Sequence, residues 1–340
     1  LGVGLWAWPL PMDYDRDGDL DLVVVCPDKP YNGTYLFENP SRGKGLGSSD
    51  DESNAVPRPS TLDSSPVFKP AVRIADGATN VQVSYIDGEP VVMTPGRIYA
   101  DFRTDQFSKP IKLPLPEKID PQFKRTRANQ WKLLDWDNDG DLDIVIGLGV
   151  WDDYGWDDAW DAEGNWKNGP LHGYVYLVEN ITEDRGVKSE DSGAVSKPST
   201  INHRPTLAAR LTALSTAKFA EPRKLTTTDG QPIDVYGMPS PNFADFDGDG
   251  NLDLICGEFL DGFTWFKNVG THEQPEYAPG VRLGSVRPGD PEDKIEASLG
   301  AEGIRMGLQM ITPVAIDWDG DGDIDLICGD EDGRVAFIER

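Results

Sequence analysis

The chain has 340 residues, 38% of them hydrophobic, and a formal net charge of −27. This length allows a sizeable core, whereas the acidic balance argues against a nucleic-acid partner, because phosphate binding requires clustered Lys and Arg. No apolar run approaches the ~20 residues that a membrane-spanning helix needs, so no transmembrane segment is predicted. Three cysteines, Cys26, Cys256 and Cys328, lie in apolar runs and predict buried thiols rather than a disulfide framework.

An acidic loop recurs along the chain and dominates the pattern. The first copy, DYDRDGDLDLVV, starts at Asp13, and the later copies start at Asp135, Asp245 and Asp317. Each reads D-x-D-x-D-G-x-[LI]-D and runs directly into an apolar segment. An internal repeat of this kind predicts a fold built from repeated units.

The spacing of the acids favours calcium, which takes 6–8 oxygen ligands that a tight loop can supply from alternate residues. In the first copy, Asp13, Asp15, Asp17 and Asp21 offer carboxylates, and Gly18 permits the sharp turn. The seventh position is expected to offer its backbone carbonyl, and Asn occupies it in the third copy. The predicted metal-binding residues are Asp13, Asp15, Asp17, Asp19, Asp21, Asp135, Asp137, Asp139, Asp141, Asp143, Asp245, Asp247, Asp249, Asn251, Asp253, Asp317, Asp319, Asp321, Asp323 and Asp325.

An EF-hand is the rival interpretation of these loops. It requires a Glu at loop position 12 and a helix on each side. Position 12 is occupied here by Val24, Ile146, Cys256 and Cys328. The sequence therefore predicts about four calcium ions in loops that join strands, with a structural role.

Further elements recur in chain order after each acidic loop. An apolar strand follows the loop, and a turn leads to an aromatic-rich strand that reads TYLFEN, YVYLVEN, FTWFKN or VAFIER. Outer segments contain an aromatic residue shortly before a proline, and proline is tolerated on an edge strand. This order predicts an all-β protein, a β-propeller of four-stranded antiparallel blades with the acidic loops between first and second strands.

The repeats resemble the FG-GAP or VCBS repeats of calcium-binding β-propellers, the family that includes the head of the integrin α-chain. The resemblance covers most of the chain and implies a propeller, commonly seven-bladed, with calcium sites on one face. It implies no single activity, because members include adhesion proteins, lectins and polysaccharide-degrading enzymes.

The whole chain, 1–340, is predicted to form one propeller domain. The predicted blades span about 5–75, 78–115, 130–227, 240–284 and 311–340, the last one incomplete. The second blade lacks the early acids of the loop, so no calcium is expected there. Seven blades are expected in the full protein, and a five-blade ring closed by the N-terminus is the alternative. A short helix, LAARLTALSTA, is expected on the calcium face.

The face opposite the acidic loops is predicted to bind a ligand, because long connections on a rigid scaffold commonly carry function. Its richest segment, 148–172, combines aromatic rings with acids, which suits sugar rings. The predicted ligand-binding residues are Trp151, Tyr154, Trp156, Trp160, Trp166 and Tyr31. Packing of these rings into a small core of the loop itself is an equally open alternative.

Three classes of function remain open from the sequence, one of them a structural scaffold whose face docks other domains. The first is a secreted or cell-surface module that binds a glycan or an extracellular protein. The second is a carbohydrate-active enzyme, most plausibly a polysaccharide lyase, with His172, Tyr154 and Arg125 as candidates for base and charge neutraliser. A glycosidase pair drawn from Glu258, Asp261 and Glu331 is a further alternative.

Overall fold

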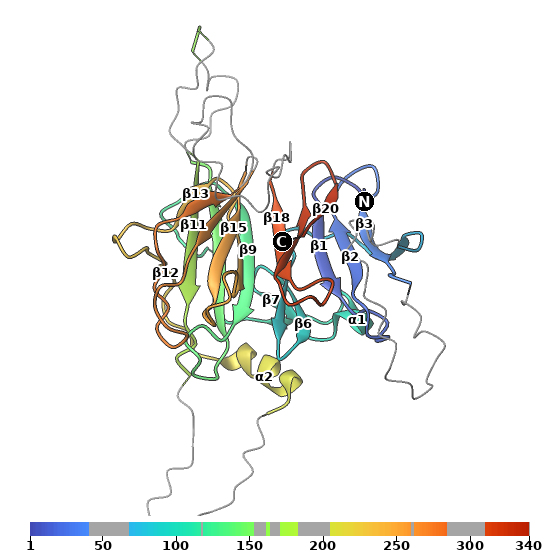
Figure 1. Ribbon diagram of the computed structural model, residues 1–340, viewed down its shortest axis with the longest axis horizontal. Coiled ribbons are helices and arrows are strands. Elements are labelled where there is room, and N and C mark those ends of the chain that lie inside the picture. The colour runs from blue at the N-terminus through green and yellow to red at the C-terminus, as the bar shows by residue number, and fades with distance from the viewer. Residues whose placement is uncertain are drawn as a thin grey trace, which may run out of the picture.

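A computed structural model describes residues 1–40, 68–116, 118–152, 161–163, 171–182, 205–259, 262–283 and 310–339. The described residues form an all-β molecule built from five antiparallel sheets (Figure 1). None of the described helices is long and apolar enough to span a membrane.

The sheets follow one another along the chain. The first contains β1 (Trp8–Met12), β2 (Asp21–Cys26), β3 (Gly33–Phe37) and β4 (Val72–Ala75). The second contains β5 (Gln82–Ile86), β6 (Glu89–Thr94), β7 (Arg97–Tyr99) and β8 (Ile111–Lys112), with α1 (Phe102–Asp105) before β8. The fourth contains β14 (Ser240–Ala244), β15 (Asp253–Gly257), β16 (Phe263–Phe266) and β17 (Val281–Leu283). The fifth contains β18 (Thr312–Ile316), β19 (Asp325–Gly329) and β20 (Val335–Ile338).

The third sheet has a divided outer strand. It consists of β9 (Thr126–Leu134), β10 (Asp143–Val150) and β11 (His172–Val178), followed by β12 (Arg223–Lys224) and β13 (Asp234–Tyr236). Both short strands pair with β11, β12 at Tyr176 and Leu177 and β13 at residues 172–174. The sheet therefore extends past the predicted end at residue 227.

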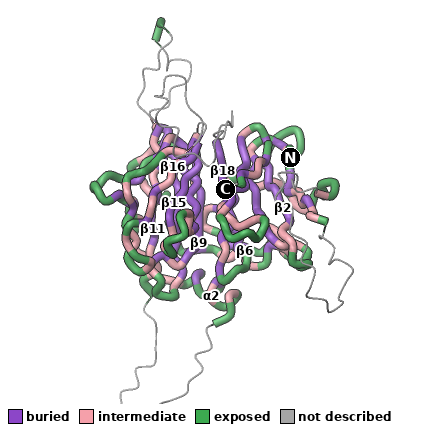
Figure 2. The backbone as a smooth tube through the Cα atoms, in the orientation of Figure 1, coloured by how far each residue is buried: buried purple, intermediate pink, exposed green. Residues whose placement is uncertain are grey.

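In the four sheets with an acidic loop, the second strand is buried along its length. Every residue of β2, β10, β15 and β19 is buried (Figure 2). Such strands read as continuous Val, Ile and Leu runs, because both of their faces pack on neighbours. Cys26, Cys256 and Cys328 are buried and free, which confirms the prediction of packing thiols.

Glycines at the ends of second strands allow neighbouring sheets to approach closely. A Cβ at Gly147 would collide with the carbonyl oxygen of Pro239, and one at Gly257 with that of Ile311. The same contact joins the fifth sheet to the first, since a Cβ at Gly329 would collide with the carbonyl oxygen of Ala7. The same close approach at a glycine therefore occurs between sheets three and four, four and five, and five and one.

The first strands of the sheets contact one another in a cycle. β1 contacts β5, β5 contacts β9, β9 contacts β14, β14 contacts β18, and β18 contacts β1. The N-terminal segment also pairs with the fifth sheet: Gly2 bridges Arg334, and the amide of Val3 donates to the Gly333 carbonyl at 2.8 Å. The two ends of the described chain thus meet in one sheet.

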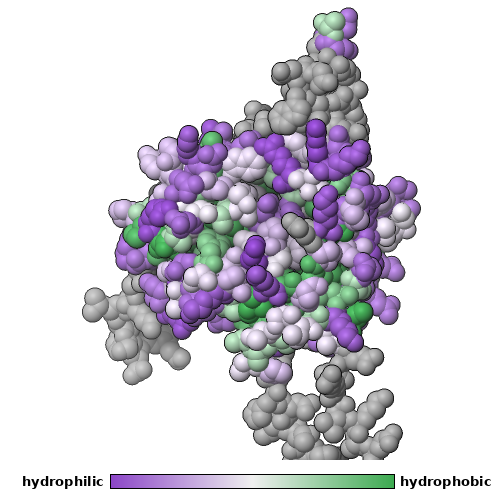
Figure 3. All heavy atoms as spheres, turned by 180° about the vertical axis from the view of Figure 1, so that it is seen from behind, coloured by the Kyte–Doolittle hydropathy of each residue, from purple (hydrophilic) through white to green (hydrophobic). Residues whose placement is uncertain are grey.

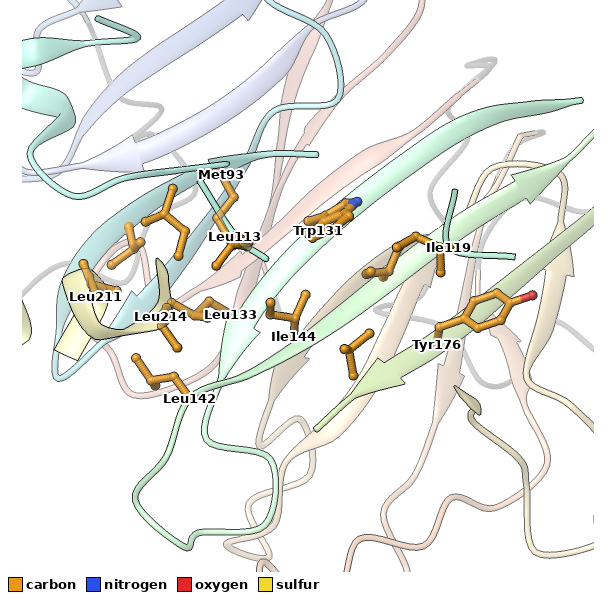
Figure 4. Close-up of a cluster of buried hydrophobic side chains, with 14 of the residues drawn as sticks. Met93, Leu113, Ile119, Trp131, Leu133, Leu142, Ile144, Tyr176, Leu211 and Leu214 are labelled. Atoms are coloured by element: carbon orange, nitrogen blue, oxygen red, sulfur yellow. The ribbon is translucent and has the colours of Figure 1, made fainter. Parts of the chain in front are cut away.

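The apolar core lies between neighbouring sheets. One cluster joins the second and third sheets through Met93, Trp131 and Ile144, and Leu211 and Leu214 cap it (Figure 4). These two leucines belong to α2 (Leu207–Ala213) and the 3-10 turn η1 (Leu214–Thr216). Seen from behind, hydrophilic side chains cover much of the surface, with apolar ones in smaller areas between them (Figure 3).

The predicted short helix lies beside an acidic loop. The Arg210 guanidinium of α2 donates to the carbonyl oxygen of Gly140 at 3.2 Å and to Asp87 Oδ2 at 2.9 Å. Gly140 belongs to the acidic loop of the third sheet, and Asp87 to the turn between β5 and β6. The helix is therefore on the acidic-loop side, as predicted.

Candidate metal centres

The four acidic loops each join the first and second strands of a sheet, as predicted. In every loop, three carboxylates come together with one oxygen of each within 4.8 Å of the others. The groups are Asp13, Asp15 and Asp17; Asp135, Asp137 and Asp143; Asp245, Asp247 and Asp249; and Asp317, Asp319 and Asp325. These clusters could hold metal ions.

The first loop shows how the backbone shapes a cluster. Asp13 accepts hydrogen bonds from the amides of Asp17 at 3.0 Å and Gly18 at 3.2 Å. Gly18 has a φ of 99°, a left-handed conformation that residues with a Cβ rarely adopt. The first aspartate therefore organises the turn that brings the later ones beside it.

The seventh loop position acts through its backbone. The amides of Asp19, Asp141, Asn251 and Asp323 each donate to the carboxylate two residues earlier, at 2.8–3.0 Å. Their side chains are not among the clustered carboxylates described above. Metal ligation by their carbonyl oxygens stays a prediction.

The last aspartate of each loop is buried and ties the loop to the sheet. Asp21 accepts from the amide of Tyr14 at 3.0 Å and from that of Asn39 at 2.7 Å. Asp143 accepts equivalent bonds from Trp136 at 2.9 Å and Asn180 at 2.7 Å. One carboxylate therefore joins the start of the loop to the residue that follows the third strand.

Sequence reasoning did not assign a role to this asparagine. It recurs as Asn39, Asn180 and Asn268, the second residue after the third strand. The Asn268 amide donates to Asp253 at 2.7 Å. The repeated E-N and K-N pairs at the end of the aromatic strand were the signal available in the sequence. The aspartate that the asparagine contacts is distant in the chain, and the fold determines that contact.

The electrostatics of the third-sheet loop favour a bound cation. The pKa of Asp143 is raised to about 7, mainly by burial and also by the nearby charges of Asp137 and Asp139, while hydrogen bonds from two amides oppose the rise. Burial and Asp139 also raise the pKa of Asp137. Oδ1 of Asp135 and Oδ1 of Asp137 are buried without a hydrogen-bond partner among the described residues. Unpaired oxygens in a crowded anionic site fit a hard cation that prefers oxygen ligands.

The fourth-sheet loop contains a cation from the protein itself. The Lys267 ammonium forms an ion pair with Asp247 and lies 3.1 Å from Asp249 Oδ2. Lys267 follows β16, at the position where the first and third sheets have Glu38 and Glu179. This loop thus has a lysine ammonium against its carboxylates, at a position where the first and third sheets have a glutamate.

The opposite ends of the sheets contain a narrow, mainly apolar hollow with charged groups, which has no room for a water molecule. First strands run toward the acidic loops, so their N-terminal ends lie at the other end of each sheet. The hollow there is lined by Trp6, Trp8, Met238, Met310, Asp330 and Glu331, among others. Trp8 Nε1 and Asp330 Oδ2 are buried without a hydrogen-bond partner among the described residues.

A guanidinium lies between two indole rings near this hollow. The Arg127 guanidinium carbon is 4.9 Å from the ring centroid of Trp6 and 4.5 Å from that of Trp151. Burial raises the pKa of Glu331, while Arg127 opposes the rise. Aromatic rings, a cation and a partly buried acid therefore lie together at this end.

Trp151 is packed in the structure, as in the alternative that the sequence left open, although its partners come from outside its own loop. Only 4% of Trp151 is exposed, its indole N–H donates to the Gly237 carbonyl at 2.9 Å, and its ring meets Phe259 edge-on at 5.0 Å. It is a packed residue, because the turn after β10 directs it inward. Tyr31 is 62% exposed. Four other predicted ligand-binding residues lie outside the described residues: Tyr154, Trp156, Trp160 and Trp166.

His172 is paired with an acid that the sequence did not suggest. Its Nδ1 is 2.6 Å from Asp234 Oδ2, and its ring stacks on Tyr174 with centroids 5.4 Å apart. The Lys224 ammonium lies 3.5 Å from the Tyr174 centroid. Asp234 reaches His172 because β13 pairs beside β11, a contact that depends on the fold.

The other candidates for chemistry lie apart from His172 in the described contacts. The Arg125 amide donates to Asp152 at 2.5 Å. Glu258 is buried, accepts from the Thr264 hydroxyl and lies 3.4 Å from Arg282. Asp261 is outside the described residues.

Comparison with known proteins adds no assignment. No protein-family description matches the sequence, and no curated protein matches it either. The resemblance to calcium-binding repeats therefore remains a prediction from the loop motif. Any function has to be inferred from the geometry of the sites themselves.

Proposed function

We propose that this chain is a calcium-stabilised β-propeller that binds a glycan or an extracellular protein at the end of its sheets opposite the acidic loops. The observation that carries the proposal is the recurrence of a three-carboxylate cluster at the same place in four sheets. A secreted or cell-surface location goes with it, because near-millimolar extracellular calcium keeps even weak loops filled.

Three observations support a five-bladed ring. The first strands contact one another in a cycle, and the same glycine approach joins successive sheets, including the fifth to the first. Residues 1–3 lie beside β20, where the other blades have a fourth strand. The ring of five that the sequence left as an alternative is thus favoured over seven blades.

Calcium suits the loops better than a softer metal. The clustered side chains are all carboxylates, with neither a thiolate nor an imidazole among them, and hard oxygen ligands favour calcium or magnesium. Calcium also accepts irregular coordination, which loops of this size provide more easily than an octahedron. The bound ion would supply positive charge that offsets carboxylate repulsion.

The opposite end offers groups that suit a polar ligand. Trp8 Nε1 and Asp330 Oδ2 are buried without a hydrogen-bond partner among the described residues, and a ligand that completes their hydrogen bonds would have to widen the closed gap that they line. Arg127 adds a cation held by two rings. These features favour binding. The lyase alternative has support of its own, because His172 stacks on Tyr174 and the Lys224 ammonium lies 3.5 Å from the centroid of that ring.

A glycan screen on calcium-loaded protein tests the proposal, with binding and ultraviolet absorbance of unsaturated uronate products followed together. Binding without turnover that is lost on Arg127→Ala supports the binding module. New absorbance on a uronic-acid polymer that disappears in His172→Ala overturns it in favour of a lyase. Calcium titration by native mass spectrometry tests the metal, and a chain that binds no calcium contradicts this part.

A further inference from the structure

Lys267 gives the fourth-sheet loop its own counter-ion. Its ammonium contacts Asp247 and is 3.1 Å from Asp249 Oδ2, and both acids cluster with Asp245. The side chains of the pair that is 3.1 Å apart are only 37% and 33% exposed. The ammonium therefore touches carboxylates that a metal ion in this loop would also need.

The corresponding residues of two other sheets point their charge elsewhere. Glu38 pairs with Lys69, and Glu179 lies 3.3 Å from Arg223. Both partners come from the segment that leads into, or forms, the outer strand of the sheet. In those sheets this position is an anion paired with a cation of the outer segment, whereas in the fourth sheet it is a cation in contact with the loop acids.

The backbone holds Lys267 at the loop. The next residue, Asn268, donates its amide to Asp253 at 2.7 Å. Asp253 is fully buried, and its other oxygen has no hydrogen-bond partner of normal geometry among the described residues. In the first and third sheets, the equivalent oxygen accepts the amide of Tyr14 or Trp136. The loop of the fourth sheet is thus assembled around a different set of contacts.

We propose that Lys267 is a tethered counter-ion that makes the loop from Asp245 to Asp253 the weakest of the four calcium sites. The inference rests on the proposed function, because it concerns the affinity of one of those sites. A tethered group competes at a high effective concentration, and an incoming ion must displace the ammonium and bear its repulsion. Three loops then fill with calcium first, and the fourth fills only at higher concentration.

Calcium titration of wild type against Lys267→Gln and Lys267→Glu tests this inference, with ions counted by native mass spectrometry. The glutamate variant restores the residue type of Glu38 and Glu179. Both variants should strengthen the weakest site, by roughly five- to tenfold for glutamine. The matched control is Lys69→Gln, which removes an equal charge near the first loop that is bound to Glu38 instead.

Melting temperature in chelator gives a readout that does not depend on calcium binding. Without metal, Lys267→Gln should lower the melting temperature by about 2 °C, since the carboxylates lose their counter-ion. With saturating calcium, the difference should vanish or reverse. Four sites of equal affinity in wild type, unchanged by Lys267→Gln, would overturn the inference while leaving the calcium proposal standing. A chain that binds no calcium would overturn both.

Discussion

The backbone N–H of Asn39 donates a 2.7 Å hydrogen bond to Oδ1 of Asp21, which lies 18 positions earlier in the chain. The other oxygen of Asp21 accepts the amide of Tyr14 at 3.0 Å. A single buried carboxylate thus fixes both the entry of the acidic loop and the exit of the third strand. The aspartate stabilises the sheet even without metal.

Asp21→Ala should destabilise the protein in the presence of chelator. Two partly buried amides lose their acceptor, and the loss of a buried hydrogen-bond partner costs about 1–3 kcal/mol at most for each of them. The control is Asp19→Asn, which copies the residue found at the same position of the third loop copy and should change the free energy of unfolding by less than ~0.5 kcal/mol. Urea denaturation measures both. Equal stability of the two variants would refute the structural role.

Because of Lys132, the free energy of unfolding should rise with pH in the alkaline range. Burial lowers the pKa of its amine from 10.5 to about 7, and Nζ donates to the Val83 carbonyl at 2.6 Å. The unfolded chain therefore binds more protons between about pH 7 and 10.5, so stability rises with pH across this window, by at most ~1.4 kcal/mol per unit. Below pH 7 both states are protonated and the contribution is flat.

The variant Lys132→Met tests this dependence. It should be more stable than wild type at pH 7 and should lack the rise. Lys112→Met, at an exposed position on β8, is the matched control and should keep the wild-type profile. Parallel pH profiles for wild type and Lys132→Met would show that the buried amine does not titrate in this window.

Gly329→Ala should weaken the contact between the fifth and first sheets. The added methyl would meet the carbonyl oxygen of Ala7, and forced overpacking costs about 1–3 kcal/mol. Gly2→Ala is the control, because a Cβ there has only an ordinary contact with Gly333. Thermal unfolding compares them. An unchanged midpoint for Gly329→Ala would contradict the close packing of these sheets.

Trp151 and Tyr31 should differ in how much their side chains contribute to the stability of the protein. Truncation of the buried indole, Trp151→Ala, should cost about 3–5 kcal/mol of stability. Tyr31→Ala, at a 62% exposed position, should leave stability within ~0.5 kcal/mol. Denaturant unfolding checks both variants. A Trp151→Ala protein as stable as wild type would contradict the packed role of this side chain and would support the ligand-binding role that the sequence suggested.

Local spacing was sufficient to predict the acidic loops and the strands that follow them. The alternate acids and the glycine act within nine residues, so chain connectivity alone brings Asp13, Asp15 and Asp17 together. The residues that meet them from a distance, Asn39 and Lys267, were missed because strand pairing positions them. The choice between packing and ligand binding at Trp151 was open for the same reason, since its partners Gly237 and Phe259 come from a later part of the chain.

The His172 site shows again that the sequence can identify a residue without identifying its distant partner. The sequence singled out the imidazole, but its acid, Asp234, lies 62 positions away and arrives on a short strand. Blade number was likewise open, because the contact between β18 and β1 joins opposite ends of the chain.

The pairing of residues 1–3 with residues 333–335 has a consequence for biosynthesis. During translation, β1 is made long before β18 and β19, which it contacts. Its side chains Trp8, Leu10 and Met12 can pack early on the second sheet, against Val81 and Val83, whereas the contact with β18 must wait. Contacts at such sequence separation form slowly, so the step that joins the fifth sheet to the first should come late in folding.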